Sequence, residues 1–200
     1  MQRILATATG FAVLATASAI AGERETNTAI FGADPGQGKA FACYTRVYDA
    51  VHLTGHPKQN VTSMTLLVSS SVDAESGRQY SAEIGVKFRN ASTQFQAGSG
   101  CSISDDGKSA LNCPIDCDGG EIDVRLRDAN SLLVSIPDGA QTWDPNNPDA
   151  EPDSAAYDAA HFGADDKLFR LDRTKLADCL PLAGDDETKA DLAAAANATQ

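Results

Sequence analysis

The stretch Tyr80-Ser-Ala-Glu-Ile-Gly-Val-Lys-Phe88 decides the fold class of this chain. Every second residue is apolar, and the residues between them are polar or glycine: the apolar set is Tyr80, Ala82, Ile84, Val86 and Phe88. Successive side chains of a β-strand point to opposite faces, so a period of two predicts a strand with one buried face and one wet face.

Further segments show the same alternation or a β-branched composition. They cover residues 41–48, 61–72, 95–97, 101–104, 110–113, 122–126, 132–136 and 168–171. Turn residues separate them, and strands do not alternate with helices, which argues against parallel α/β folds. We therefore predict an all-β domain, an antiparallel β-sandwich or small β-barrel of about eight strands with one or two short helices. One helix is expected over 49–56, with Asp49 as N-cap, and another within 172–182.

The predicted β-rich domain spans residues 40–183. Residues 22–39 show no period and predict a flexible N-terminal arm. Residues 144–166 combine prolines with many acidic residues, which predicts a long acidic loop. Residues 184–200 are charged and then Ala-rich, and we expect a flexible tail there, with a frayed helix over 188–196 at most.

The N-terminus has the parts of a secretory signal peptide. Arg3 precedes an uncharged apolar run over 4–17, and small residues before Ala21 fit a cleavage site. Residues 1–21 are therefore predicted to be removed during export to the periplasm or the exterior. No Cys lies near the cut, which argues against a lipoprotein, and no later segment reads as a membrane span.

The chain of 200 residues is acidic, with a net charge of −12 that becomes −13 when Arg3 leaves with the leader. Such a surface repels nucleic acid and anionic lipid headgroups. It favours a cationic protein, a small cationic ligand or a divalent metal as partner.

Five cysteines lie in the exported part, and an oxidising compartment favours disulfides among them. A three-residue turn at 106–108 places Cys101 directly opposite Cys113; a two-residue turn makes Cys101–Cys117 equally plausible. Cys43 and Cys179 lie near the two ends of the domain, and a bridge between them would close a long loop. Because five is odd, one thiol stays free or pairs outside the chain.

Two residue pairs are candidate metal ligands. Cys113 and Cys117 are four residues apart, a spacing that suits a soft ion such as Cu(I) and is similar to that in exported copper chaperones of the Sco type. His52 and His56 would share one face of a helix and could hold Zn or Cu, although surface histidines are the plainer interpretation.

The acidic loop offers oxygen ligands for Ca, although its spacing matches no EF-hand. The candidate ligands are Asp144, Asn146, Asp149, Glu151 and Asp153. The sequence shows no nucleophile elbow, and it identifies no carboxylate pair for hydrolysis.

Three stretches carry a resemblance over most of the exported chain. They are residues 43–57 (Cys-Tyr-Thr-Arg-Val-Tyr-Asp-Ala-Val-His-Leu-Thr-Gly-His-Pro), 117–120 (Cys-Asp-Gly-Gly) and 165–172 (Asp-Asp-Lys-Leu-Phe-Arg-Leu-Asp). With them the chain resembles a group of small exported bacterial proteins of unknown function. The resemblance implies a periplasmic setting and no activity.

These observations favour a non-enzymatic exported β-domain that binds a ligand or a cationic protein in the cell envelope and needs no cofactor. The first alternative is a periplasmic metal-handling protein that uses Cys113 and Cys117, or His52 and His56. The second is an envelope hydrolase with an unidentified carboxylate pair.

Overall fold

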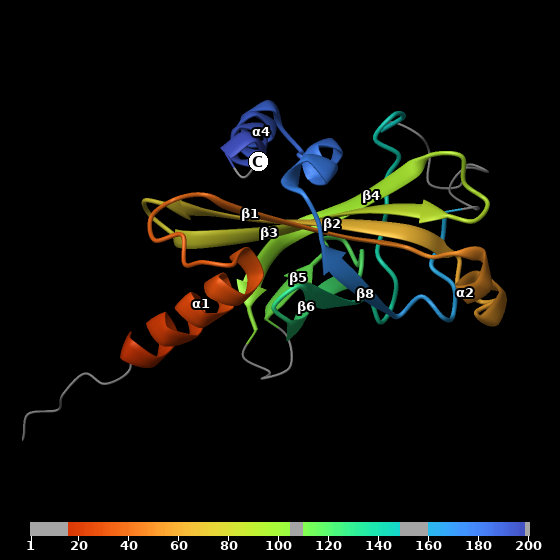
Figure 1. Ribbon diagram of the computed structural model, residues 1–200, viewed down its shortest axis with the longest axis horizontal. Helices are drawn as coiled ribbons and strands as arrows, with labels where there is room; N and C mark the ends of the chain where they lie inside the picture. The colour runs from red at the N-terminus through yellow and green to blue at the C-terminus, as the bar shows by residue number, and fades with distance from the viewer. Residues whose placement is uncertain (1–15, 105–109, 149–159, 199–200) are drawn as a thin grey trace, which may run out of the picture.

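The computed structural model describes residues 16–104, 110–148 and 160–198, and eight antiparallel strands in chain order close into a barrel (Figure 1). The strands are β1 (Ala40–Val47), β2 (Val61–Asp73), β3 (Gly77–Phe88), β4 (Gln94–Ile103), β5 (Leu111–Pro114), β6 (Glu121–Asp128), β7 (Ser131–Ser135) and β8 (Leu168–Arg173). Pairing of Tyr44 with Arg173 joins β1 to β8 and closes the barrel. The all-β prediction is confirmed, and the barrel is the correct one of its two alternatives.

The inward face of the strands forms the core. The alternating residues of β3 point inward as predicted, and Ala82, Ile84 and Val86 are fully buried. Large side chains from the other strands meet them, including Tyr44, Met64, Leu66, Phe95, Leu111, Ile122, Leu132 and Phe169. Side chains fill the interior of a barrel of this size.

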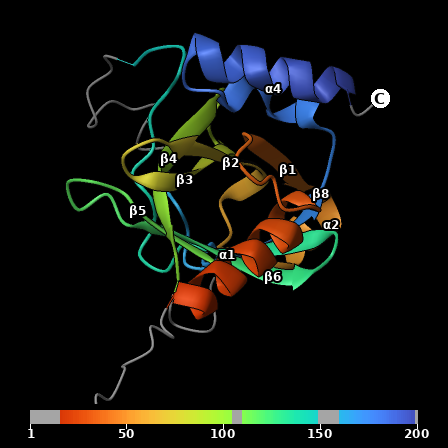
Figure 2. The ribbon, with the colours of Figure 1, turned by 90° about the vertical axis from the view of Figure 1, so that its left-hand side faces the viewer.

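The helix α1 (Thr16–Phe31) covers one end of the barrel (Figure 2). Ile30 is fully buried there, and its carbonyl accepts hydrogen bonds from the Tyr44 hydroxyl at 2.7 Å and from Arg173 at 2.8 Å. The Tyr80 hydroxyl donates to the side chain of Asn27 at 2.7 Å. The flexible arm expected over 22–39 is therefore corrected: its first part is a docked helix, because polar groups at the barrel end bind its backbone.

The opposite end carries α2 (Ala50–Gly55) and the connection between β7 and β8 (Figure 1). Asp49 caps α2 as predicted, since its carboxylate accepts the His52 N–H at 2.7 Å. The buried carboxylate of Asp166 accepts backbone N–H groups of Asn60 and Gly163, both at 2.7 Å. Asp166 thus ties the two connections together, and this part of the predicted acidic loop is structural.

A second apolar cluster lies outside the barrel, under the 3₁₀ helix η1 (Leu176–Leu182) and α4 (Asp186–Ala198). Leu67 of β2 meets Leu182 and Leu192 there, beside the Cys43–Cys179 disulfide. The flexible tail expected over 184–200 is corrected, because α4 is regular from 186 to 198 and buries Leu192 completely.

Both predicted disulfides are present. Cys101 and Cys113 are bridged with a Cα–Cα distance of 4.1 Å. The pairing of Ser102 with Asn112 and of Ile103 with Leu111 confirms the register that a three-residue turn requires, although residues 105–109 lie outside the described part. None of the helices in the described ranges is long and apolar enough to cross a membrane.

Candidate ligand-binding cleft

A cleft of about 860 Å³ opens at the α2 end of the barrel, between the β5–β6 turn and the β7–β8 connection. We call it the end-loop cleft; the described residues that line it come from 115–120, 138–143, 148 and 160–162. These three main segments are far apart in sequence, and the barrel closure brings them together.

Backbone hydrogen bonds fix the walls of the cleft. The Gln141 N–H donates to the Gly119 carbonyl at 2.8 Å, and Gly120 bridges to Ala140. Trp143 and Gln96 exchange two backbone hydrogen bonds, each 2.8 Å long. Gly120 has φ +87°, and a Cβ on it would lie 2.2 Å from the Gly139 carbonyl oxygen. The close approach of the two walls therefore requires glycine at position 120.

The β5–β6 turn displays Cys117 and Asp118 at the rim. The Gly119 N–H donates to the Asp116 carbonyl at 3.1 Å, and Cys117 and Asp118 have φ of 58° and 61°. Two consecutive left-handed residues define a type I′ turn, in which Asp is common and Cys carries a steric cost. This backbone leaves the Cys117 thiol free and exposed.

Aromatic side chains connect the cleft to the core. Phe162 packs edge-on against Phe88, with ring centroids 5.3 Å apart, and against Phe169 at 6.4 Å. Trp143, the one tryptophan of the chain, is 37% exposed in the cleft. Thr142 beside it is only 8% exposed.

The charge of the cleft is negative. Asp118 and Asp138 are exposed on its lining, and none of the lining residues that the structure describes is Lys or Arg. Two carboxylates and a partly exposed indole ring share this lining, and the indole π-face and the carboxylates both attract positive charge.

Comparisons with protein-family models, with curated proteins and with solved structures find no match. The function therefore has to be inferred from the chemistry of the site.

The predicted metal-binding pair, Cys113 and Cys117, is not available as two thiols. Cys113 is bonded to Cys101, so in this oxidised form its sulfur has no thiolate to offer to a metal. Cys117 alone remains as a thiol, at the rim of the cleft.

The predicted histidine pair lies on α2. The rings of His52 and His56 stack at 4.4 Å with an interplanar angle of 22°, and Tyr48 stacks on His52 at 4.6 Å. The His52 Nε2 atom is 3.0 Å from the Gln59 side-chain oxygen. In this stacked arrangement the two rings contact each other through their faces. Within the described ranges, no group of three or more His, Cys, Asp or Glu side chains has metal-site geometry.

The candidate calcium ligands are only partly described. The Asp144 carboxylate accepts the backbone N–H of Asn146 at 2.9 Å, as in an Asx turn. Asp149, Glu151 and Asp153 lie outside the described residues.

Glu83 on β3 carries an unusual carboxyl group that the sequence does not reveal. Glu83 lies flat over Gly98 of β4, where an added Cβ would fall 1.6 Å from its Oε2 atom. Burial raises the pKa of Glu83 to about 7, and no second carboxylate contributes to the shift. In the alternating pattern Glu83 looks like an ordinary solvent-facing residue; only the pairing of β3 with β4 reveals the glycine beneath it.

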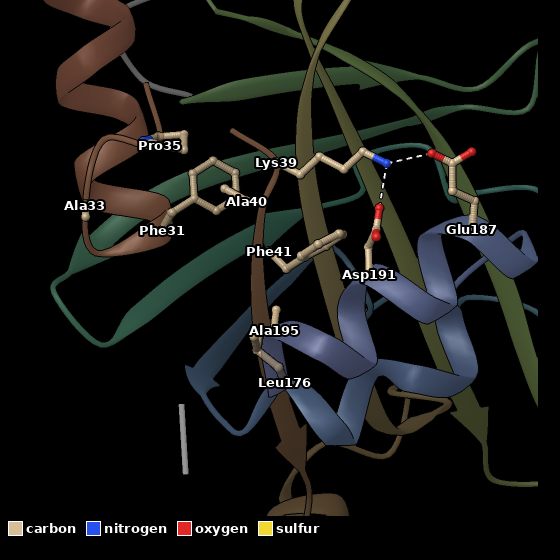
Figure 3. A pocket seen from close by; sticks show the side chains of 10 residues that line it. All are labelled: Phe31, Ala33, Pro35, Lys39, Ala40, Phe41, Leu176, Glu187, Asp191 and Ala195. Carbon is tan, nitrogen blue, oxygen red and sulfur yellow. Dashed lines mark hydrogen bonds and ion pairs between the residues drawn. The ribbon is translucent and has the colours of Figure 1, made fainter. Parts of the chain in front are cut away.

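A second cavity of about 650 Å³, which we call the helix groove, lies between the end of α1, β1 and α4 (Figure 3). Phe31 and Phe41 form its apolar walls. Lys39 reaches across to Glu187 at 2.8 Å and to Asp191 at 2.5 Å. Hydrogen bonds to Asp191 and Glu187 raise the pKa of Lys39. The charges of the helix groove are thus paired within the chain.

Proposed function

We propose that this protein is a non-enzymatic exported binding protein whose end-loop cleft takes a cationic segment of a cell-envelope protein. One observation carries the proposal: the open Trp143 lies in a cleft with two exposed carboxylates and, in its described lining, no Lys or Arg. A Lys or Arg side chain of the partner would lie over the indole face, with its charge near Asp118 and Asp138.

The rest of the chain supports this proposal. A leader over residues 1–21 would deliver the protein to an oxidising compartment, where the disulfides Cys43–Cys179 and Cys101–Cys113 are stable. The net charge, −12 for the whole chain and −13 without Arg3, favours encounter with basic proteins, since long-range attraction raises association rates.

Trp143 gives a site-specific test, because all tryptophan fluorescence comes from the cleft. We expect short Lys- or Arg-rich peptides to change the emission saturably, and Glu-rich peptides of the same length to leave it unchanged. High salt should weaken the binding, because exposed charges are screened.

The variant Asp118→Asn/Asp138→Asn should reduce the affinity for the cationic peptides about tenfold, for a loss of about 1.4 kcal/mol. Glu75→Gln, in the β2–β3 turn at the other end of the barrel, is the matched control and should bind normally. Equal binding of acidic and basic peptides, or no binding of either, would refute the proposal.

A further inference from the structure

A third cavity, of about 990 Å³, lies where β8 ends, between the last residue of α1 and the start of η1. We call it the Arg173 pocket. Its apolar wall consists of Phe31, Phe41 and Leu176, which also line the neighbouring helix groove (Figure 3). The volume is within the range of small-molecule sites, which combine apolar walls with a few polar groups that fix the ligand.

The apolar wall joins two parts of the molecule. Phe31 packs against the barrel core, whereas Phe41 and Leu176 pack against the outer cluster under η1 and α4. All three side chains are only partly buried, so each keeps apolar surface exposed. Phe31 is the last residue of α1, and removal of the predicted leader over 1–21 leaves it in place. An apolar ligand body would cover surface that the two clusters leave open, which is favourable.

The polar side of the Arg173 pocket is cationic. Arg173 and Lys175 line it, and none of the lining residues that the structure describes is Asp or Glu. Within the described ranges, neither cation makes an ion pair with a carboxylate. Asp178, which the Thr174 hydroxyl binds, is not part of the lining. The pocket therefore has the opposite charge preference from the end-loop cleft.

Contacts within the chain hold the Arg173 guanidinium in place. It donates to the Ile30 carbonyl at 2.8 Å, and its Cζ atom lies 4.8 Å from the centroid of the Tyr44 ring. These partners orient the half-buried cation but do not neutralise it as a carboxylate would. An anion in the pocket would therefore meet a positioned charge, at a low cost in side-chain entropy.

We propose that the Arg173 pocket binds a small amphipathic carboxylate, with its head group at Arg173 and Lys175 and its apolar body against the apolar wall. A guanidinium recognises a carboxylate through paired N–H donors, and the Lys175 ammonium adds a point charge beside it. A free fatty acid of medium chain length has this chemistry. The site is separate from the end-loop cleft, so the inference goes beyond the proposed function and does not depend on it.

Three ligands with the same eight-carbon chain test the inference: octanoate, octanol and octylammonium. Each is titrated into the disulfide-bonded protein by calorimetry, and NMR follows the methyl signals of Leu176 and Ala177, which line the pocket. We expect octanoate to bind at a single site at least about tenfold more tightly than octanol, and octylammonium to leave these signals unchanged. The affinity should rise from butanoate to octanoate, because each buried CH₂ group adds transfer free energy.

Variants assign the charge preference to the pocket. Lys175 is exposed, and Lys175→Gln should weaken octanoate about threefold and leave octanol binding unchanged. Lys189→Gln is the matched control, because Lys189 is exposed on α4 outside the lining; it should bind octanoate as the wild type does. Arg173→Lys keeps the charge but loses the paired donors, and should weaken octanoate more than Lys175→Gln.

Equal affinities for the three ligands, or equal effects of Lys175→Gln and Lys189→Gln, would overturn the inference. So would octanoate shifts at the methyl group of Ala140, in the end-loop cleft, in place of those at Ala177. Octanoate should leave the emission of Trp143 unchanged, because the one tryptophan lies in the end-loop cleft. Failure of octanoate to bind would refute this site alone, and failure of the cationic peptides would refute the proposed function alone.

Discussion

The helix groove and the end-loop cleft are cavities of similar size that differ in how their polar groups are satisfied. In the helix groove, Lys39 is bonded to two carboxylates of α4, and the cysteines nearby form a disulfide. In the end-loop cleft, the Cys117 thiol is free and exposed, and the described lining offers no Lys or Arg to pair with Asp118 and Asp138. The helix groove therefore belongs to the interface that holds α4 on the barrel. The end-loop cleft instead leaves a thiol and two carboxylates open to an external ligand.

The largest expected effect concerns the Cys43–Cys179 disulfide, at the interface between α4 and the barrel. Replacing both Cys43 and Cys179 by Ser should lower the free energy of unfolding by about 4 kcal/mol, because this bridge spans 136 residues. Urea unfolding measures it. The same replacement at Cys101 and Cys113, which are 12 residues apart, should cost about 2 kcal/mol less. Peptide binding at Trp143 should survive loss of the Cys43–Cys179 bridge; if it disappears, the two cavities are not independent.

The second effect concerns the close contact between Gly120 and Gly139, which joins two walls of the end-loop cleft. Gly120→Ala should destabilise the protein by about 2–3 kcal/mol and abolish peptide binding, because its Cβ would meet the Gly139 oxygen at 2.2 Å. Gly139→Ala is the matched control: its φ is +88°, but nothing lies within 4 Å of an added Cβ. It should cost only about 1 kcal/mol. Equal losses in urea unfolding would contradict the tight contact between the walls.

The third effect concerns Glu83 on strand β3 of the barrel. The folded-state pKa of Glu83, about 7, lies above its ordinary value of 4.5. Its stabilising contribution is therefore complete below about pH 4.5 and is lost as the pH rises through 7. Glu83→Gln should raise the free energy of unfolding by about 2 kcal/mol at pH 8 and change it little at pH 4.5. Exposed Glu75→Gln should show no such pH dependence. A parallel pH profile for the wild type and Glu83→Gln would refute the assignment.

The smallest effect is expected from the exposed ion pairs of the helix groove. Lys39→Met should shift the urea midpoint only slightly, because solvent screens exposed pairs and Met retains the apolar stem. Peptide binding at the end-loop cleft should not change. A large loss of stability would mean that these pairs, and not Leu192, hold α4 on the barrel.

The sequence was informative where structure depends on local pattern. The period of two identified β3, Asp49 marked the start of α2, and the spacing of Cys101 and Cys113 around their turn predicted a disulfide. Each of these features is determined by residues within about a dozen positions of one another.

The cleft and the docked helix could not be predicted in this way, because they depend on contacts between distant segments. Asn27 and Tyr80 are 53 residues apart, and the Gly119–Gln141 contact crosses two strands. Barrel closure sets these contacts, and the order and register of strands are needed to see them. The pair Cys117 and Asp118 carried one local signal, since Asp-Cys-Asp-Gly reads as a turn.

Quenching of Trp143 fluorescence by small ions measures whether the end-loop cleft is open and negatively charged. Caesium and iodide ions are quenchers of opposite charge, and both are compared with their quenching of free tryptophan amide. We predict that caesium quenches Trp143 more effectively than iodide at low ionic strength, and that Asp118→Asn/Asp138→Asn removes the difference. Equal quenching in the wild type, or a preference for iodide, would show that the surroundings of Trp143 are not negatively charged.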